Sequence, residues 1–79
     1  MNLKKIKDLY LVAFLICKGE KPSKTERSGP VLWFVFKESK ENSQLIQDYW
    51  NNTTFVDARS FSEQIKNLKN RIFSENQNN

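Results

Sequence analysis

Apolar residues are most concentrated near the start of the chain, where Leu9–Cys17 form nine residues without a charge. A helix over these residues would be apolar on every side and would have to be covered on every side. Asp8 can accept free backbone N–H groups as an N-cap, and Gly19 can end a helix in the left-handed conformation. The pattern therefore predicts a central helix of about three turns, around which the rest of the chain packs.

A second apolar run, residues 31–36, consists of β-branched and aromatic residues and is typical of a strand. Gly29, just before it, can take a positive φ in a turn. We therefore expect a hairpin whose edge strand begins at Lys21 or Ser23 and ends at Arg27. Because both faces of residues 31–36 are apolar, this strand needs a central position in a larger sheet or a partner on its second face.

The remainder of the chain predicts two amphipathic helices. Ser39 can cap the first of them, and Asp57 can cap the second. The apolar stripe of the first consists of Leu45, Ile46, Tyr49 and Trp50. The apolar positions of the second keep a spacing of three and four, at Ala58, Phe61, Ile65, Leu68 and Ile72. Residues 53–56, between the two helices, are extended by composition and predict a short third strand.

Together these elements predict one small α+β domain over residues 1–74, in which a β-hairpin packs with three helices. Their order is helix, strand, strand, helix, an optional short strand, helix. A chain of 79 residues is long enough for one domain of this size. Residues 75–79, which are mostly Asn and Gln, predict a disordered tail.

The residue types exclude most catalytic and metal-binding chemistry. The chain has no histidine and a single cysteine, Cys17, which removes the Cys–His nucleophile and the common zinc sites. Two glycines are too few for a phosphate-binding loop. Helix capping or a solvated helix surface explains Asp8, Asp48 and Asp57. We therefore expect no catalytic residue, no metal, no cofactor and no enzymatic activity.

Lys4, Lys5 and Lys7, followed by the apolar stretch, imitate a secretory signal. The bulky side chains of residues 14–16 precede Cys17 at the place where a processing enzyme requires small ones, which argues against export. Nine apolar residues are also about half of what a membrane-spanning helix needs. Because a lone cysteine fits a reducing compartment, we expect a cytoplasmic protein without membrane contact.

Five segments spread over the chain carry a resemblance to a known family. They are Asp8-Leu9-Tyr10-Leu11-Val12-Ala13-Phe14-Leu15 with Gly19, Trp33-Phe34-Val35-Phe36, Asp48-Tyr49-Trp50, Val56-Asp57-Ala58-Arg59 with Phe61, and Leu68-Lys69-Asn70-Arg71-Ile72-Phe73. In these segments the chain is similar to small uncharacterised proteins of bacteria, archaea and their phages, described as a domain of unknown function. The resemblance implies a prokaryotic or phage origin and an intracellular accessory protein, and it carries over no catalytic or binding residues.

Nucleic-acid binding is the leading hypothesis for function. The formal net charge is +4, and a basic stripe lies beside the apolar stripe of the last helix. Such a flank could neutralise phosphates of a duplex or a single strand. The predicted nucleic-acid-binding residues are Lys4, Lys5, Lys7, Arg59, Lys66 and Lys69. No set of residues matches a known motif that reads bases in a DNA groove. The hypothesis is therefore limited to a small non-enzymatic accessory binding module. Its source would be a prokaryote, its phage or another mobile element.

The alternative hypothesis is a protein-interaction module or inhibitor, with a homodimer as one version of it. The strand over residues 31–36 is apolar on both faces, and nearby aromatic residues could leave a patch for a partner or a second copy. The predicted protein-interface residues are Trp33, Tyr49, Trp50 and Phe55. Three helices could instead cover both faces of the sheet, and the basic residues would then serve solubility.

Overall fold

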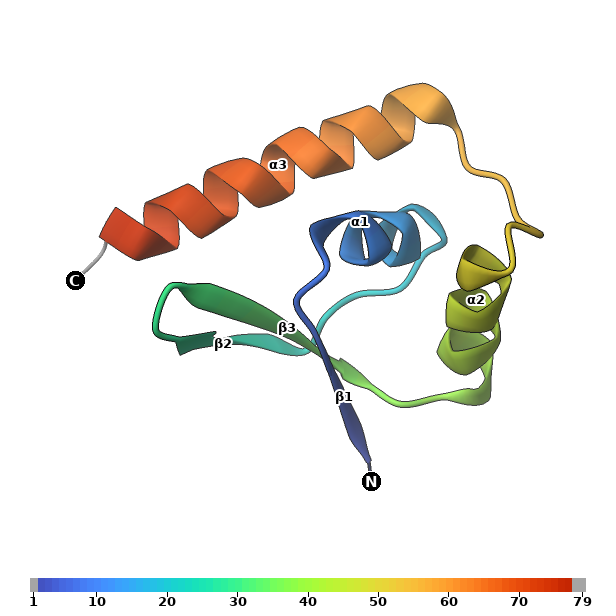
Figure 1. Cartoon of the computed structure of the whole chain (residues 1–79), viewed down its shortest axis with the longest axis horizontal. Coiled ribbons are helices and arrows are strands. Elements are labelled where there is room, and N and C mark those ends of the chain that lie inside the picture. Colours follow the sequence, from blue (N-terminus) through green and yellow to red (C-terminus); the bar gives the residue numbers. More distant parts are fainter. Residues whose placement is uncertain (1, 78–79) are drawn as a thin grey trace.

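A computed structural model of the chain describes residues 2–77, in which three helices and three strands form an α+β domain (Figure 1). The elements are β1 (Leu3–Ile6), α1 (Leu9–Cys17), β2 (Lys24–Ser28), β3 (Val31–Lys37), α2 (Lys40–Trp50) and α3 (Ala58–Gln77). The predicted fold class, with a hairpin and three helices, is confirmed.

Helix α1 forms the centre of the domain. The Asp8 carboxylate accepts the backbone N–H groups of Tyr10 and Leu11 at 3.0 and 3.2 Å, which confirms the predicted N-cap. Gly19 follows the helix with a φ of +98°, as expected for a residue that ends a helix. Residues 11–15 are all buried, so five successive side chains that point in all directions around the axis are covered.

The sheet has the order β1-β3-β2, and β3 pairs antiparallel with both neighbours. Of the two alternatives predicted for the strand over residues 31–36, the structure shows the central position in a larger sheet. Since β1 and β2 are each antiparallel to β3, they run parallel to each other, and α1 connects them. Gly29 and Pro30 form the two-residue turn of the β2–β3 hairpin, and Gly29 has a φ of +60°.

The third strand is not the one predicted at residues 53–56, which form no strand. Residues 52–53 instead help to end α2, because Asn52 takes a φ of +58° and the Thr53 N–H donates to the Asp48 carbonyl at 3.0 Å. The third strand is β1, at the start of the chain. In β1 two successive lysines interrupt the alternation of apolar and polar residues that would indicate a strand. Its buried residue is Ile6, which lies opposite Phe34.

The two faces of the sheet differ in what covers them. The inner face, formed by Ile6, Leu32, Phe34 and Phe36, packs in one core cluster with buried side chains of α1 and Leu68 of α3. Partly buried side chains of α2 and α3 complete this cluster. Among the described residues, the outward positions Val31, Trp33 and Val35 do not belong to it. The expectation that the helices cover both faces is therefore wrong, because all three helices contribute to the same core.

The buried side chain of Asn42 joins three segments of the chain. Its Oδ1 accepts the backbone N–H of Ser39 at 3.1 Å, and its own backbone N–H donates to Ser39 Oγ, which gives a capping box at the start of α2. Its Nδ2 donates to the Lys37 carbonyl at 2.8 Å and to Glu20 Oε1 at 3.1 Å. Asn42 thus fixes α2 to the end of β3 and to the loop that follows α1.

Helix α3 crosses α1 and ends near the hairpin (Figure 1). Asp57 caps it as predicted, since its Oδ2 accepts the backbone N–H of Ser60 at 2.9 Å. Near the other end, Arg27 Nη2 donates to the Ile72 carbonyl at 3.4 Å. The helix continues to Gln77, and the part of the predicted disordered tail at residues 78–79 lies outside the described residues.

Replacing Phe14 by alanine should lower the free energy of unfolding by about 3 to 5 kcal/mol, because the ring is 1 % exposed and its removal leaves a cavity beside α1. A matched control is Phe73→Ala, at a side chain that is 62 % exposed, which should cost less than about 1 kcal/mol. Thermal or urea unfolding measures both. Similar losses for the two variants would contradict the central position of α1.

Replacing Asn42 by alanine should lower the free energy of unfolding by about 2 to 3 kcal/mol, because it leaves the Ser39 N–H and the Lys37 carbonyl without their partner in a partly buried site. Asn67→Ala, on the exposed surface of α3, is the control and should stay within about 0.5 kcal/mol. Urea unfolding compares the free energies of unfolding of the two variants, provided that the dependence on urea concentration is the same for both. A loss at Asn42 no larger than that at Asn67 would show that the network does not hold α2.

Candidate nucleic-acid interface

The outer face of the sheet is built from alternate residues of three strands. We define it by the outward positions Leu3, Lys5, Lys24, Glu26, Ser28, Val31, Trp33, Val35 and Lys37, together with Lys7, which follows β1. The register places Lys5 of β1 and Lys24 of β2 on either side of Val35 of β3. Lysines therefore flank the central strand from both edges of the sheet.

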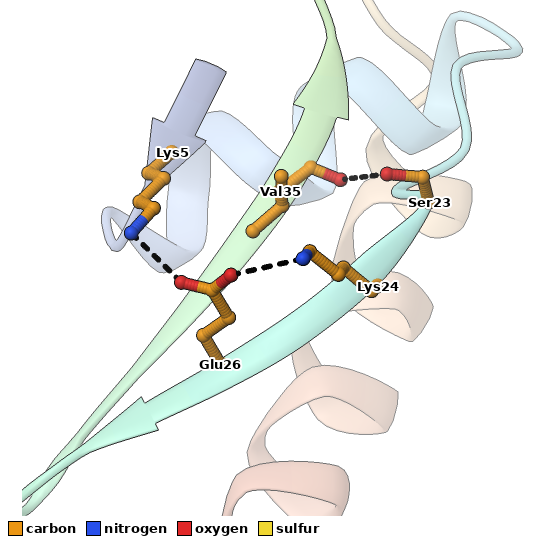
Figure 2. Close-up of polar contacts among 5 residues, drawn as sticks. All are labelled: Lys5, Ser23, Lys24, Glu26 and Val35. Atoms are coloured by element: carbon orange, nitrogen blue, oxygen red, sulfur yellow. Dashed lines mark hydrogen bonds and ion pairs between the residues drawn. The ribbon is translucent and has the colours of Figure 1, made fainter. Parts of the chain in front are cut away.

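A glutamate connects these two lysines across the sheet (Figure 2). Glu26 Oε1 lies 2.8 Å from Lys5 Nζ, and Glu26 Oε2 lies 3.1 Å from Lys24 Nζ. Val35 lies between them and is fully buried although it is outside the core cluster. The aliphatic stems of the lysines can cover an apolar side chain while their charged ends stay in water. On the outer face charged side chains can thus cover the sheet, as helices do on the inner face.

The ion pairs also set the charge state of Glu26. Its pKa is lowered from the ordinary value of 4.5, first by the hydrogen bond from Lys5 and then by the one from Lys24. At neutral pH the group is therefore a carboxylate held between two ammonium groups. Between these two lysines the outer face thus already binds an anionic group, the Glu26 carboxylate.

Trp33 lies on β3 opposite Glu26, and its side chain is partly exposed. The Nζ atom of Lys7 lies 5.6 Å from the centroid of the Trp33 ring, which is a cation–π contact. Of the described outward residues, Trp33 is the one aromatic side chain on this face. Its neighbours are thus cations on one side and the Glu26 carboxylate on the other.

The structure separates the six residues that the sequence predicted for nucleic-acid binding. Lys5 and Lys7 lie on the outer face, whereas Lys4 points to the other side of β1 and donates to Ser43 Oγ of α2 at 3.0 Å. The remaining three, Arg59, Lys66 and Lys69, are exposed on α3, which packs against α1 on the inner side of the sheet. They form no single surface with Lys5 and Lys7.

Sequence reasoning missed two cations of the outer face, Lys24 and Lys37. Lys24 alternates with Glu26 along the predicted edge strand, so the hairpin register could have placed it beside Val35. Lys37 follows the apolar run and extends the outward positions of β3 by one. Their relation to Lys5 depends on β1, which the sequence did not predict as a strand.

The predicted protein-interface residues are divided as well. Trp33 belongs to the outer face, while Tyr49, Trp50 and Phe55 lie at the end of α2 and just beyond it. The Tyr49 ring packs against Phe14 with centroids 5.2 Å apart and meets Trp50 edge-on at 5.0 Å. Trp50 and Phe55 are 62 % and 87 % exposed. Two aromatic side chains therefore remain open to solvent at the α2–α3 connection.

Most of the chain matches the model of a known protein family. The model of a family described as "Domain of unknown function (DUF5659)" matches residues 1–74. The chain belongs to the DUF5659 family. The matched region begins before β1 and ends within α3, so it includes all three strands of the sheet. No curated protein and no solved structure matches the chain.

Two further observations concern the part of the DUF5659 chain that the structure describes. Over residues 2–77, no helix is both long enough and apolar enough to cross a membrane. The same residues contain no group of three or more Cys, Asp or Glu side chains placed to hold a metal ion.

Proposed function

We propose that this DUF5659 domain is a small binding module without enzymatic activity that contacts nucleic acid through the outer face of its sheet. The observation that carries the proposal is the charge of that face. Among its described residues, the cations are Lys5, Lys7, Lys24 and Lys37, and the acid is Glu26. Both oxygens of that acid are already engaged by lysines.

Phosphate groups are the natural partners of such a surface. Lysines neutralise phosphates and release their counterions, which supplies most of the sequence-independent affinity for nucleic acid. On the outer face the ammonium groups of Lys5 and Lys24 already converge on one carboxylate, so a phosphate oxygen could take up the same contacts. The stripe of Arg59, Lys66 and Lys69 on α3 has no comparable convergence of cations on an anion among the described contacts.

The proposal extends to the setting of the protein. It acts in the cytoplasm, and, as the resemblance of its segments implies, in a prokaryote or a phage. Cys17 is partly buried, and burial together with the nearby Asp57 carboxylate raises the pKa of its thiol. A thiol of this kind is a packing residue that fits reducing surroundings.

Replacing Lys5 and Lys24 by glutamine should weaken binding to labelled oligonucleotides, because two phosphate contacts are lost. The slope of log affinity against log salt should flatten by about 1.4 for a single strand. Fluorescence anisotropy between about 50 and 200 mM salt measures it. In the same assay Glu26→Gln should tighten binding, since it frees both lysines.

The matched control is the double variant Lys66→Gln, Lys69→Gln, which removes the same charge from α3. It should retain the parent slope. Equal losses for the two double variants would mean that net charge alone attracts the oligonucleotide, and absence of binding by the parent protein at low salt would reject the proposal outright.

Protein binding is a second candidate function, favoured by the exposure of Trp50 and Phe55. Large exposed aromatic side chains are typical of interfaces, and here the second copy of the chain is the partner that can be tested directly. We expect sedimentation equilibrium to reveal a dimer that the variant Trp50→Ser, Phe55→Ser abolishes without changing oligonucleotide binding. A monomer at every protein concentration would reject this candidate.

A further inference from the structure

We infer that the ligand of the outer face is a single-stranded nucleic acid, and that one of its unpaired bases stacks on Trp33. This inference rests on the proposed function and specifies its ligand. It starts from the position of Trp33 on the central strand of the sheet, with lysines on both neighbouring strands. An aromatic ring in the middle and cations at the rim match the two parts of a nucleotide, the base and the phosphate.

The arrangement of the lysines fits a strand that lies across the sheet. Lys5 and Lys24 belong to the two edge strands, whose backbones are roughly 10 Å apart because β3 lies between them. Lys37 continues the outward positions of β3, and Lys7 extends beyond the end of β1. Trp33 therefore has Lys7 on one side and Glu26 on the other, and Lys5 and Lys24 flank Val35, the next outward position of β3. A bound strand can turn a base toward Trp33 and keep its phosphates near these lysines.

Stacking on Trp33 requires a base that is not paired and stacked inside a duplex. Proteins read single strands by placing bases on aromatic side chains of open sheets, with a positively charged surface along the backbone. A duplex hides the faces of its bases, and its major groove is read by an inserted helix or β-ribbon. The three helices within residues 2–77 pack on the inner face, so none of these described residues places such a helix on the outer face.

Lys7 marks the part of the indole that a base would occupy. Its ammonium group lies 5.6 Å from the ring centroid, and the Trp33 side chain is partly exposed. A base that stacks on the indole displaces this ammonium group, which then reaches a phosphate of the same strand. The exchange replaces one contact of the ring with another and leaves the core unchanged.

Intrinsic fluorescence tests this inference, because the chain has two tryptophans and Trp50→Phe leaves Trp33 as the remaining one. In that background, a thymine single strand should quench the Trp33 emission, and the corresponding duplex should bind more weakly and leave the emission unchanged. In anisotropy, Trp33→Leu should reduce single-strand affinity by about 5- to 150-fold. Trp33→Phe, which keeps an aromatic face, should retain most of the affinity.

The outcomes separate this inference from the proposed function. If single strand and duplex bind equally well, Trp33 emission does not change, and Lys5→Gln with Lys24→Gln still weakens binding, then stacking is overturned while phosphate contact stands. If no oligonucleotide binds, the proposed function fails and the inference fails with it. A thermal melt of each Trp33 variant confirms that the fold is intact, and the quenching measurement itself uses the unaltered Trp33.

Discussion

The burial of residues 11–15 of α1 is the constraint on which the rest of the structure depends. A helix that is apolar on all sides is stable in water only if its neighbours surround it. Here the inner face of the sheet, α2 and α3 all contribute to the same cluster around residues 11–15. Residues 2–77, which the structure describes, contain no helix beyond these three. The arrangement of the domain thus follows from the need to enclose one short segment.

The outer face of the sheet shows the consequence of this constraint. β3 is apolar at Val31, Trp33 and Val35, yet no helix within the described part of the chain packs on that side. Long charged side chains of the edge strands flank β3 on that side, and Glu26 pairs with Lys5 and Lys24, which lie on either side of the buried Val35. A surface made in this way is cationic at its rim and apolar at its centre. The proposed ligand requires these properties. The charged side chains that flank the apolar positions of β3 therefore also form the candidate site.

Local signals in the sequence predict the elements whose boundaries are fixed by neighbouring residues. Asp8 and Gly19 delimit α1, Gly29 forms the hairpin turn, and Ser39 and Asp57 cap the two later helices. The strand β1 escapes such reasoning because its stability comes from pairing with β3, about thirty residues later in the chain. Residues 53–56 show the converse, since a strand-like composition does not make a strand where the segment pairs with no other strand.

The candidate site is non-local for the same reason. Lys5 and Lys7 could be selected from charge alone, but their association with Lys24 and Trp33 exists only through the register of three strands. The basic stripe on α3 has correct helical periodicity, yet α3 packs on the inner side of the sheet. Periodicity identifies which residues share one helix face, whereas the sheet topology decides which surfaces can act together.

Enclosing α1 leaves the outer face of the sheet without a covering helix among the described residues, and this face is the surface through which we propose that the domain binds. The most direct test is a titration of isotope-labelled protein with a short single-stranded oligonucleotide, followed by amide chemical shifts in NMR spectra. The account predicts that the largest changes fall on β1, β2 and β3 and on the Trp33 indole N–H, with α3 nearly unchanged. Changes concentrated on the flank of Arg59, Lys66 and Lys69, with the strands unaffected, would contradict it.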